Sequence, residues 1–312
     1  MERAVPLTLF DPRRGEPALT VAPLPPQGLT PPSRSNFFTV IWVRSGRGSF
    51  GVDLAGHCVG PGSLLFAAPY QLVRLVPEAP MAGDVIRFHA NFFCIETHHE
   101  EVGCNGVLFN DHYGLPVLPM DEAFERGLGE VVAAMRRELD AAGLAHAEAL
   151  LSYLKILLIR ATRLKLEQGA STASEASAKV PPVLDELRRL IEARYRELHK
   201  PSEYAALLDM TPKALAKVVK AHLGKTLTEL IRERLMRQAK WEMLHTLKPV
   251  KQVAYELGFA DVFYFSRSFK RATGCSPAFF REYETAIRGG RNLSMPSGRA
   301  SIPTAGVVPD HH

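Results

Sequence analysis

The sequence lacks an apolar run long enough to cross a bilayer. Its most apolar stretch, Leu150 to Ile159, is interrupted by Ser152 and Lys155, whereas a spanning helix needs about 20 mostly apolar residues. No apolar segment near the N-terminus resembles a signal peptide. These absences predict a chain that works in the cytoplasm and has no membrane partner.

Cysteine and clustered histidine are also scarce. The cysteines contain no CxxC pair, which argues against a disulfide framework and a zinc ribbon and predicts buried thiols. They are Cys58, Cys94, Cys104 and Cys275. His57 and His89 stand alone, and the adjacent His98 and His99 are expected on a surface loop, because neighbouring residues of a strand point apart. Since a metal site needs three or four converging donors, we expect no metal and no metalloenzyme.

Positive charge is confined to one third of the chain. Residues 181 to 288 hold 20 Lys and Arg against 13 Asp and Glu, while the remainder holds 18 against 20. A basic surface attracts a polyanion through counterion release. The asymmetry favours a nucleic-acid partner for this third, with a solvated basic face as the alternative.

Composition divides the chain into four parts. The segment QGASTASEASAKVPP has few large apolar side chains and reads as a linker, and the tail from Gly289 has the same character and is expected to be disordered. The predicted parts are a first domain over 1–167, a linker over 168–182, a second, basic domain over 183–288 and the tail over 289–312.

The first domain changes from strand to helix along its length. From Phe37 to about Phe93, short β-branched and aromatic runs alternate with Gly and Pro turns, which indicates an antiparallel barrel or sandwich. Two helices follow, one around Leu128 to Leu139 and one from Leu150 to Leu164, both with wide apolar faces. These faces either pack against a second subunit, which would make the protein a homodimer, or cap their own barrel.

A duplication at an offset of fifty residues is the strongest pattern in the chain. The matched pairs are Leu215 with Phe265, Lys217 with Arg267, Val219 with Phe269, Lys220 with Lys270 and Gly224 with Gly274. Each copy contains a bend between two short helices, and residues before the bend match at an offset one smaller than those after it. The bend of the second copy is therefore expected to be one residue longer. Thr211 and Asp261 are predicted N-caps, and an apolar stripe between the copies predicts one long connecting helix. The duplication predicts two helix-turn-helix units.

Residues 183 to 288 resemble the DNA-binding domain of the AraC/XylS family of bacterial transcription regulators, most clearly in GFADVFYFSRSFKRATGCSPAFFRE. The stretch PGSLLFAAPYQLVRL resembles the strand pair of a cupin-like barrel found in that family. The resemblance implies an α+β protein whose N-terminal sensing and dimerisation domain holds a cupin-like antiparallel barrel. Seven helices follow, with two helix-turn-helix units joined by a long helix in a DNA-binding domain. It also implies an operator in duplex DNA, RNA polymerase as a partner, and activation as the commoner output.

On the family pattern, the base-facing positions lie near the start of each second helix. They are Lys213, Ala216 and Lys217 in the first unit and Val262, Phe263, Ser266 and Arg267 in the second. Lys217 and Arg267 can donate to guanine, although Arg267 can equally be a solvated or ion-paired arginine. Lys220 and Lys270 suit phosphates, whereas Val262 and Phe263 can contact thymine methyl groups or pack inside the domain.

Arginines among the strands of the first domain predict an effector that is an anion. They are Arg44, Arg47, Arg74 and Arg87, set among aromatic residues where alternate side chains point inward. Thr30 and Arg34 loosely resemble the arm of cyclic dinucleotide receptors. The expected effector site therefore comprises Thr30, Arg34, Arg44, Arg47 and Arg74. A cyclic dinucleotide is the first candidate, with a sugar, an aromatic acid, or arginines that merely cover the exterior as alternatives.

The sequence therefore favours a transcription regulator controlled by a small molecule. A cupin-type enzyme with a basic appendage and an architectural DNA-binding protein without a ligand are the competing functions. An enzyme would need converging acids, bases or metal ligands, and the sequence offers no such group.

Overall fold

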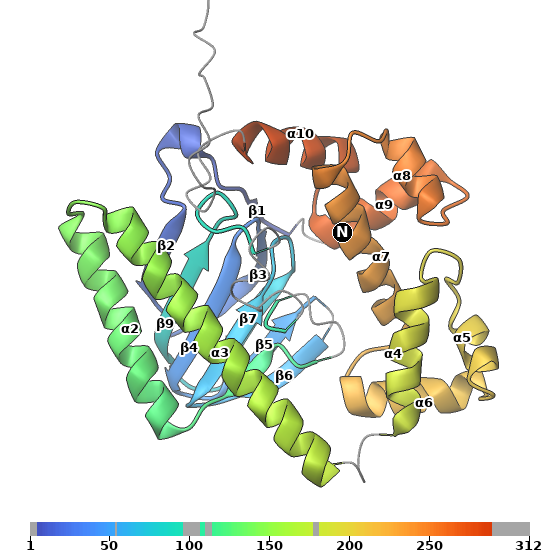
Figure 1. Ribbon diagram of the computed structural model, residues 1–312, viewed down its shortest axis with the longest axis horizontal. Helices are drawn as coiled ribbons and strands as arrows, with labels where there is room; N and C mark the ends of the chain where they lie inside the picture. Colours follow the sequence, from blue (N-terminus) through green and yellow to red (C-terminus); the bar gives the residue numbers. More distant parts are fainter. Residues whose placement is uncertain (1–4, 54, 96–106, 110–113, 177–180, 289–312) are drawn as a thin grey trace, which may run out of the picture.

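The computed structural model describes residues 5–53, 55–95, 107–109, 114–176 and 181–288. Figure 1 shows strands and two long helices forming one half of the molecule and a group of shorter helices forming the other. The α+β fold class predicted from the sequence is confirmed.

The strands form two five-stranded sheets with the orders β1-β3-β8-β5-β6 and β10-β7-β4-β9-β2. The pairing is antiparallel as predicted, apart from the short parallel pair β1 and β3. The strands are β1 Leu7–Thr8, β2 Leu19–Pro23, β3 Leu29–Ser35, β4 Phe38–Ser45, β5 Gly48–Val52, β6 Ala55–Val59, β7 Ser63–Ala67, β8 Val73–Pro77, β9 Ala82–Phe88 and β10 Val117–Pro119, with a 3-10 turn at Pro12–Arg14.

The second sheet is buried on both faces, which explains the continuous apolar run at the start of β4. Ile41 and Val43 join a core with Phe50 and Leu75 of the first sheet. Trp42 belongs instead to the core beneath the helices, on the opposite face of the sheet. Because side chains alternate across a strand, covering both faces requires apolar residues at every position.

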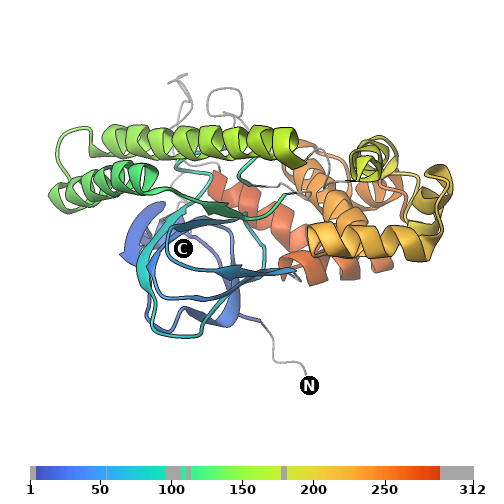
Figure 2. The same cartoon turned by 90° about the horizontal axis from the view of Figure 1, so that it is seen from below.

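Helices α2 (Glu122–Ala141) and α3 (His146–Ala176) cover the outer face of this sheet (Figure 2). Their apolar positions are buried against each other and the strands; these are Leu128, Val131, Val132, Met135, Leu150, Leu151, Leu154, Leu157, Leu158 and Ala161. Of the two alternatives for these faces, the helices cap their own barrel, so no second subunit is needed to bury them.

Helix α3 runs further than the sequence predicts. It continues to Ala176, through the first half of the segment assigned as a linker, and α4 begins at Pro182. The assignment relied on the lack of apolar side chains, but an existing helix can extend without burial when its residues favour the helical backbone, as alanine and glutamate do. Residues 177–180 of the predicted linker and the predicted tail at 289–312 lie outside the described residues, while Pro182 already belongs to α4.

Residues 181–288, all of which the structure describes, contain the seven helices that the resemblance implies. They are α4 Pro182–Arg194, α5 Pro201–Leu207, α6 Pro212–Leu223, α7 Leu227–His245, α8 Val250–Glu256, α9 Val262–Thr273 and α10 Pro277–Arg288. Leu215, Val219, Phe265 and Phe269 are fully buried in one core. The predicted inward face of each second helix is therefore confirmed.

No helix of the described segments has both the length and the apolar character that a membrane crossing demands.

The cysteines only partly follow the prediction. Cys94 and Cys275 are buried free thiols, whereas Cys58 is exposed. It lies on β6, an edge strand of the first sheet. Cys104 and the pair His98 and His99 lie outside the described residues.

Candidate DNA interface and interdomain pocket

The two copies of the repeat build the same helix-turn-helix geometry. Helices α5 and α6 are joined by a bend at 208–211, and α8 and α9 by a bend at 257–261. The second bend is one residue longer, as the sequence predicts. Gly258 occupies this longer bend at φ 80, where a Cβ would overlap the carbonyl oxygen of Arg196, so only glycine fits there.

Side-chain caps fix where each second helix begins. The Thr211 hydroxyl accepts a hydrogen bond from the Ala214 amide at 3.2 Å. The carboxylate of Asp261 accepts from the amides of Phe263 and Tyr264 at 2.8 and 3.1 Å. Both helices end at a left-handed glycine, Gly224 at φ 66 and Gly274 at φ 88. The predicted caps are therefore confirmed.

The substitution Asp261→Ala is expected to lower the free energy of unfolding of the helical domain by about 1 to 2 kcal/mol, because two amides at the start of α9 lose their acceptor. Asp261→Asn is the matched control: it removes the charge but keeps a capping oxygen, and the loss should be below about 0.5 kcal/mol. Urea denaturation followed by far-UV circular dichroism measures both variants. Equal losses would show that the charge, and not the cap, stabilises the helix.

Helices α6 and α9, the second helices of the two units, carry the predicted DNA contacts, and we call them the reading helices. Helix α6 exposes its predicted contact residues to solvent. Lys213, Ala216 and Lys217 are all exposed. Lys220 is exposed as well, and its ammonium group donates to the carbonyl oxygen of Gly224 at 2.8 Å, which satisfies the C-terminal end of its own helix. Three of the four predicted contact positions in the first unit thus carry exposed lysines.

The predicted contact positions of α9 separate into two kinds. Phe263 is 77% exposed, whereas Val262 is half-buried and packs against the domain core. Of the two alternatives, packing therefore describes Val262 but not Phe263. Ser266 is half-buried and Lys270 is exposed. The side chain of Arg267 is 67% exposed and lies 3.8 Å from the Asp261 carboxylate, a weak surface pair that leaves it able to reach a ligand.

Helix α7 joins the two units through a buried apolar face. Its stripe consists of Leu227, Leu230, Ile231, Leu235, Ala239 and Met243. On another side, the Arg234 guanidinium stacks on Tyr195 at 3.8 Å and pairs with Glu192 at 2.7 Å, which fixes α4 against α7. The second core therefore holds both reading helices in one body.

Most of the predicted effector residues are exposed on the outside of the barrel. The expectation that alternate positions turn the arginines into the barrel is wrong, because its interior is filled by an apolar core and burying unpaired guanidinium groups there would be unfavourable. Arg44 stacks on Trp42 at 3.7 Å and pairs with Asp84 at 2.9 Å on the outer side. Arg47 and Arg74 are exposed, and so is Thr30, whose hydroxyl donates to the Gln27 carbonyl.

Arg34 is the exception, because it joins the two domains. Its Nη1 donates to the carbonyl oxygens of Tyr70 at 2.6 Å and Ala272 at 2.7 Å, and its Nη2 donates to that of Arg271 at 3.1 Å. Asp53 lies 3.3 Å away. One guanidinium group of strand β3 thus binds the carbonyl end of the second reading helix, α9, where the helix dipole favours a cation.

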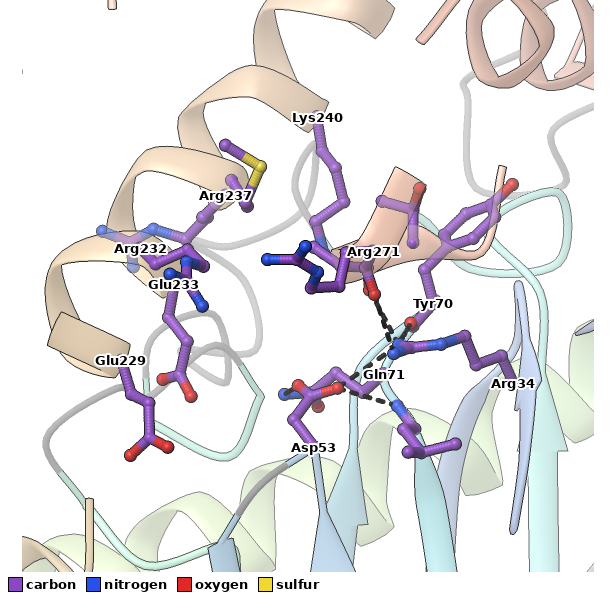
Figure 3. A pocket seen from close by; sticks show the side chains of 14 residues that line it. Arg34, Asp53, Tyr70, Gln71, Glu229, Arg232, Glu233, Arg237, Lys240 and Arg271 are labelled. Atoms are coloured by element: carbon purple, nitrogen blue, oxygen red, sulfur yellow. Dashed lines mark hydrogen bonds and ion pairs between the residues drawn. The ribbon is translucent and has the colours of Figure 1, made fainter. Parts of the chain in front are cut away.

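A cavity of about 180 Å³ opens beside Arg34, between the barrel, α7 and the end of α9 (Figure 3). Charged residues from both domains line it: Arg34 and Asp53 from the barrel, Glu229, Arg232, Glu233, Arg237 and Lys240 from α7, and Arg271 from α9. The apolar part of its wall comes from Tyr70, Leu72, Met236 and Ala272. Burial raises the pKa of Asp53 above its usual value, despite the hydrogen bond from the Leu72 amide. We call this cavity the interdomain pocket.

A buried polar cluster holds α10 against the barrel next to this pocket. Glu284, only 1% exposed, accepts hydrogen bonds from the Tyr70 hydroxyl and from the Asn36 amide at 3.1 Å. Burial and the Glu284 carboxylate raise the pKa of Tyr70, so its hydroxyl stays protonated and donates. Burial also lowers the pKa of His89, 3.9 Å from Glu284, to about 3, so the ring is neutral at physiological pH. We call these four residues the Glu284 cluster.

Neither the interdomain pocket nor the Glu284 cluster was found from the sequence. Arg34 was a predicted effector residue, but its partners on α9 could not be foreseen. The left-handed backbone of Asp53 and Tyr70, at φ 54 and φ 69, leaves no mark in the sequence. Within the described residues, no group of three or more His, Cys, Asp or Glu side chains is arranged to hold a metal ion.

Comparisons with known proteins agree with this geometry. A family profile described as "Helix-turn-helix domain" matches residues 204–283. The chain is 21% identical over 286 residues to the HTH-type transcriptional activator RhaS of Klebsiella pneumoniae, covering 88% of this chain and 96% of that protein. It is 35% identical over 72 residues to the arabinose operon regulatory protein of Escherichia coli, covering 23% of this chain and 25% of that protein.

Among solved structures, the C-terminal domain of AraT, a response regulator from Geobacillus stearothermophilus, is 27% identical, with a TM-score of 0.32, covering 34% of this chain and 88% of that one. These relatives are regulators of transcription and not enzymes. The duplicated helix-turn-helix units and the matched family profile identify residues 204–283 as a helix-turn-helix domain similar to that of AraC/XylS transcriptional regulators.

Proposed function

We propose that the protein is a sequence-specific activator of transcription whose DNA affinity is controlled by a small-molecule effector. The observation that carries the proposal is the pair of helix-turn-helix units, in which every predicted contact position except Val262 and Ser266 is exposed while both domains are docked. Two reading helices on one rigid body can enter successive major grooves of the same duplex.

The reading helices divide between base and backbone contacts. Lys217 and Arg267 donate to guanine, where a bidentate contact contributes about 1 to 3 kcal/mol of discrimination. Phe263 contacts a thymine methyl group, Lys220 and Lys270 bind phosphates, and the remaining positions, Lys213, Ala216, Val262 and Ser266, flank these contacts. The exposure of Phe263, unusual for a large apolar side chain, supports its role.

We expect the effector to be an anion, because cationic side chains outnumber carboxylates in the lining of the interdomain pocket. RNA polymerase and a second copy of the chain are the further partners, and a regulator of chromosomal DNA works in the cytoplasm. Dimerisation would bring four reading helices to one operator and lengthen the site that the protein recognises.

A mobility-shift titration tests this function. The full chain is titrated against the DNA upstream of its own gene and against a scrambled duplex of equal length, at about 50 and 200 mM salt. We expect tighter binding to the upstream DNA at both salt concentrations, because base contacts persist when phosphate contacts weaken. Equal affinity for both duplexes would identify an architectural protein instead, and no binding to either would contradict a DNA-binding function.

A further inference from the structure

The internal repeat allows the two reading helices to be compared position by position. After the bends, the offset of fifty residues pairs Lys213 with Phe263, Ala214 with Tyr264, Lys217 with Arg267 and Ala221 with Arg271. All of these side chains are exposed in the docked protein. Because the two units share their geometry, a difference in chemistry at a matched position is a difference in what each unit offers to DNA.

One stripe of exposed side chains on α9 has no equivalent on α6. The α9 stripe consists of Tyr264, Arg267 and Arg271. Intervals of three and four residues place its members on one side of the helix. The matching stripe of α6 consists of Ala214, Lys217 and Ala221. Only the second unit can therefore align three contact groups along one flank of its reading helix.

The two outer members of the α9 stripe have donors that the fold does not use. Tyr264 is 51% exposed, and within the described residues its hydroxyl forms no hydrogen bond. Arg271 is exposed at the rim of the interdomain pocket, and in the same described part of the chain its guanidinium group forms no ion pair. Arg34 donates to the carbonyl oxygen of Arg271 at 3.1 Å, which fixes the backbone that carries this arginine. Both groups can donate to DNA without breaking an internal contact.

The position of these donors on the helix suits phosphate groups. A helix in the major groove faces base edges and has a phosphate backbone on either side. With 3.6 residues per turn, Arg271 lies about 40° around the helix from Arg267, beside the proposed base contact. Tyrosine hydroxyls and arginines are common donors to phosphate oxygens, and a guanidinium group can bind a phosphate through two parallel hydrogen bonds. This flank of α9 therefore meets a phosphate backbone when Arg267 reaches the bases.

The positions that face the bases are unequal as well. Arg267 has a planar fork of donors that fits the guanine edge, whereas the ammonium group of Lys217 is a point charge on a flexible stem. Phe263 offers an apolar surface that can distinguish thymine by its methyl group, and the matching Lys213 offers only another charge. Positive charge attracts every phosphate alike, so the lysines of α6 add affinity that depends little on sequence.

We propose that the two units divide operator recognition unequally. The second unit recognises the sequence of one half-site through Phe263 and Arg267 and binds its backbone through Tyr264 and Arg271, while the first unit holds the other half-site mainly through charge. This inference rests on the proposed DNA-binding function. It adds two phosphate contacts and assigns most of the sequence discrimination to α9.

Duplexes with one half-site scrambled test the division. A footprint of the full chain on the DNA upstream of its own gene locates the two half-sites, about one helical turn apart. We expect scrambling of the half-site under α9 to lower the affinity about thirtyfold or more, and scrambling of the half-site under α6 to lower it less than about fivefold. Equal losses, or a larger loss under α6, would overturn the inference.

Arg267→Ala identifies which half-site lies under which helix. It should weaken binding to the intact duplex and to the duplex scrambled under α6, but should cause no further loss on the duplex scrambled under α9, where its base contact is already absent. Losses of the same size on all three duplexes would mean that Arg267 reads no base, which would also overturn the inference.

Two single variants test the phosphate contacts in the same mobility-shift titration. Tyr264→Phe removes only a hydroxyl that the fold does not use, and we expect it to weaken binding to every duplex about threefold or more. Arg271→Ala removes one phosphate contact, so the slope of the logarithm of affinity against the logarithm of salt concentration should become shallower by about 0.9. Arg47→Ala is the matched control, because it removes the same charge from an exposed position on the barrel; its slope should equal that of the wild type.

The reciprocal change supplies the first unit with the arginine that it lacks. Ala221 is exposed at the position that matches Arg271, so Ala221→Arg should raise the affinity and steepen the salt slope by about 0.9. An unchanged slope in Ala221→Arg would contradict the inference, as would a wild-type affinity in Tyr264→Phe or a slope in Arg271→Ala equal to that of Arg47→Ala.

The failure of this inference is distinct from the failure of the proposed function. A wild type that prefers the upstream DNA to a fully scrambled duplex but loses affinity equally from either half-site would remove the inference and leave the proposed function intact. A wild type that binds the upstream and fully scrambled duplexes equally would remove the proposed function itself.

Discussion

Reversing the charge at Lys217 and Arg267 together is expected to lower operator affinity about a hundredfold or more. Each side chain is exposed near the start of a reading helix, and each proposed guanine contact contributes about 1 to 3 kcal/mol. Two lost contacts amount to about 2 to 6 kcal/mol, and every 1.4 kcal/mol is about tenfold. New carboxylates facing phosphates add repulsion. A mobility-shift titration of Lys217→Glu/Arg267→Glu against the upstream DNA measures the loss.

The matched control reverses the charge of two arginines that lie outside the proposed DNA interface. Arg47→Glu/Arg74→Glu changes the net charge of the protein by the same amount, and both side chains are exposed on the barrel. Its operator affinity should stay within about threefold of the wild type, since distant surface charges act only through screened, long-range forces. If both double variants lose affinity equally, the charge of the whole protein and not the reading helices determines binding.

Removing the Glu284 carboxylate is expected to destabilise the docked protein by about 3 to 5 kcal/mol, the usual effect of deleting one partner of a buried ionic group. In Glu284→Ala, the Tyr70 hydroxyl and the Asn36 amide lose a shared acceptor, and Arg288 loses a carboxylate at 3.2 Å. Because these bonds link α10 to the barrel, the two domains should unfold in separate transitions. Guanidinium chloride denaturation followed by tryptophan fluorescence can resolve them, with Trp42 in the barrel and Trp241 on α7.

Glu282→Ala is the control for this experiment, because Glu282 lies on the same helix and is exposed. Its effect should be within about 0.5 kcal/mol. A Glu284→Ala protein that is as stable as Glu282→Ala, with one unfolding transition, would mean that the Glu284 cluster does not hold the domains together.

The helix-turn-helix domain was predictable because its determinants are close together in the chain. The spacing of Phe265 and Phe269, the caps at Thr211 and Asp261, and the glycines that end both helices act within one or two turns. Each signal is short-range and recurs fifty residues away, so the two copies support each other. The structure agrees with every one of them.

The apolar helices of the first domain were harder to interpret. An apolar face shows that a helix packs against another surface, but not whether that surface belongs to the same chain or to a second subunit. The sequence left open whether α2 and α3 cover their own barrel or a second subunit. Their buried residues lie on the outer face of the second sheet. Similarly, the sequence indicates that Arg44 and Arg74 face away from the apolar residues next to them in their strands. It does not indicate which face of the sheet becomes the interior, because that depends on where the other sheet packs.

The sequence by itself determined the duplicated helix-turn-helix fold, the concentration of positive charge in its domain and the resemblance of that domain to AraC/XylS regulators, since each of these depends on local patterns or composition. Only the tertiary structure decided that Arg34 binds the end of α9, that Glu284 joins α10 to the barrel, and that a cationic pocket lies between the domains. The bonded partners are 238 residues apart for Arg34 and Ala272 and 248 apart for Asn36 and Glu284. Contacts over such separations follow from how two finished domains fit together, which no local pattern of side chains encodes.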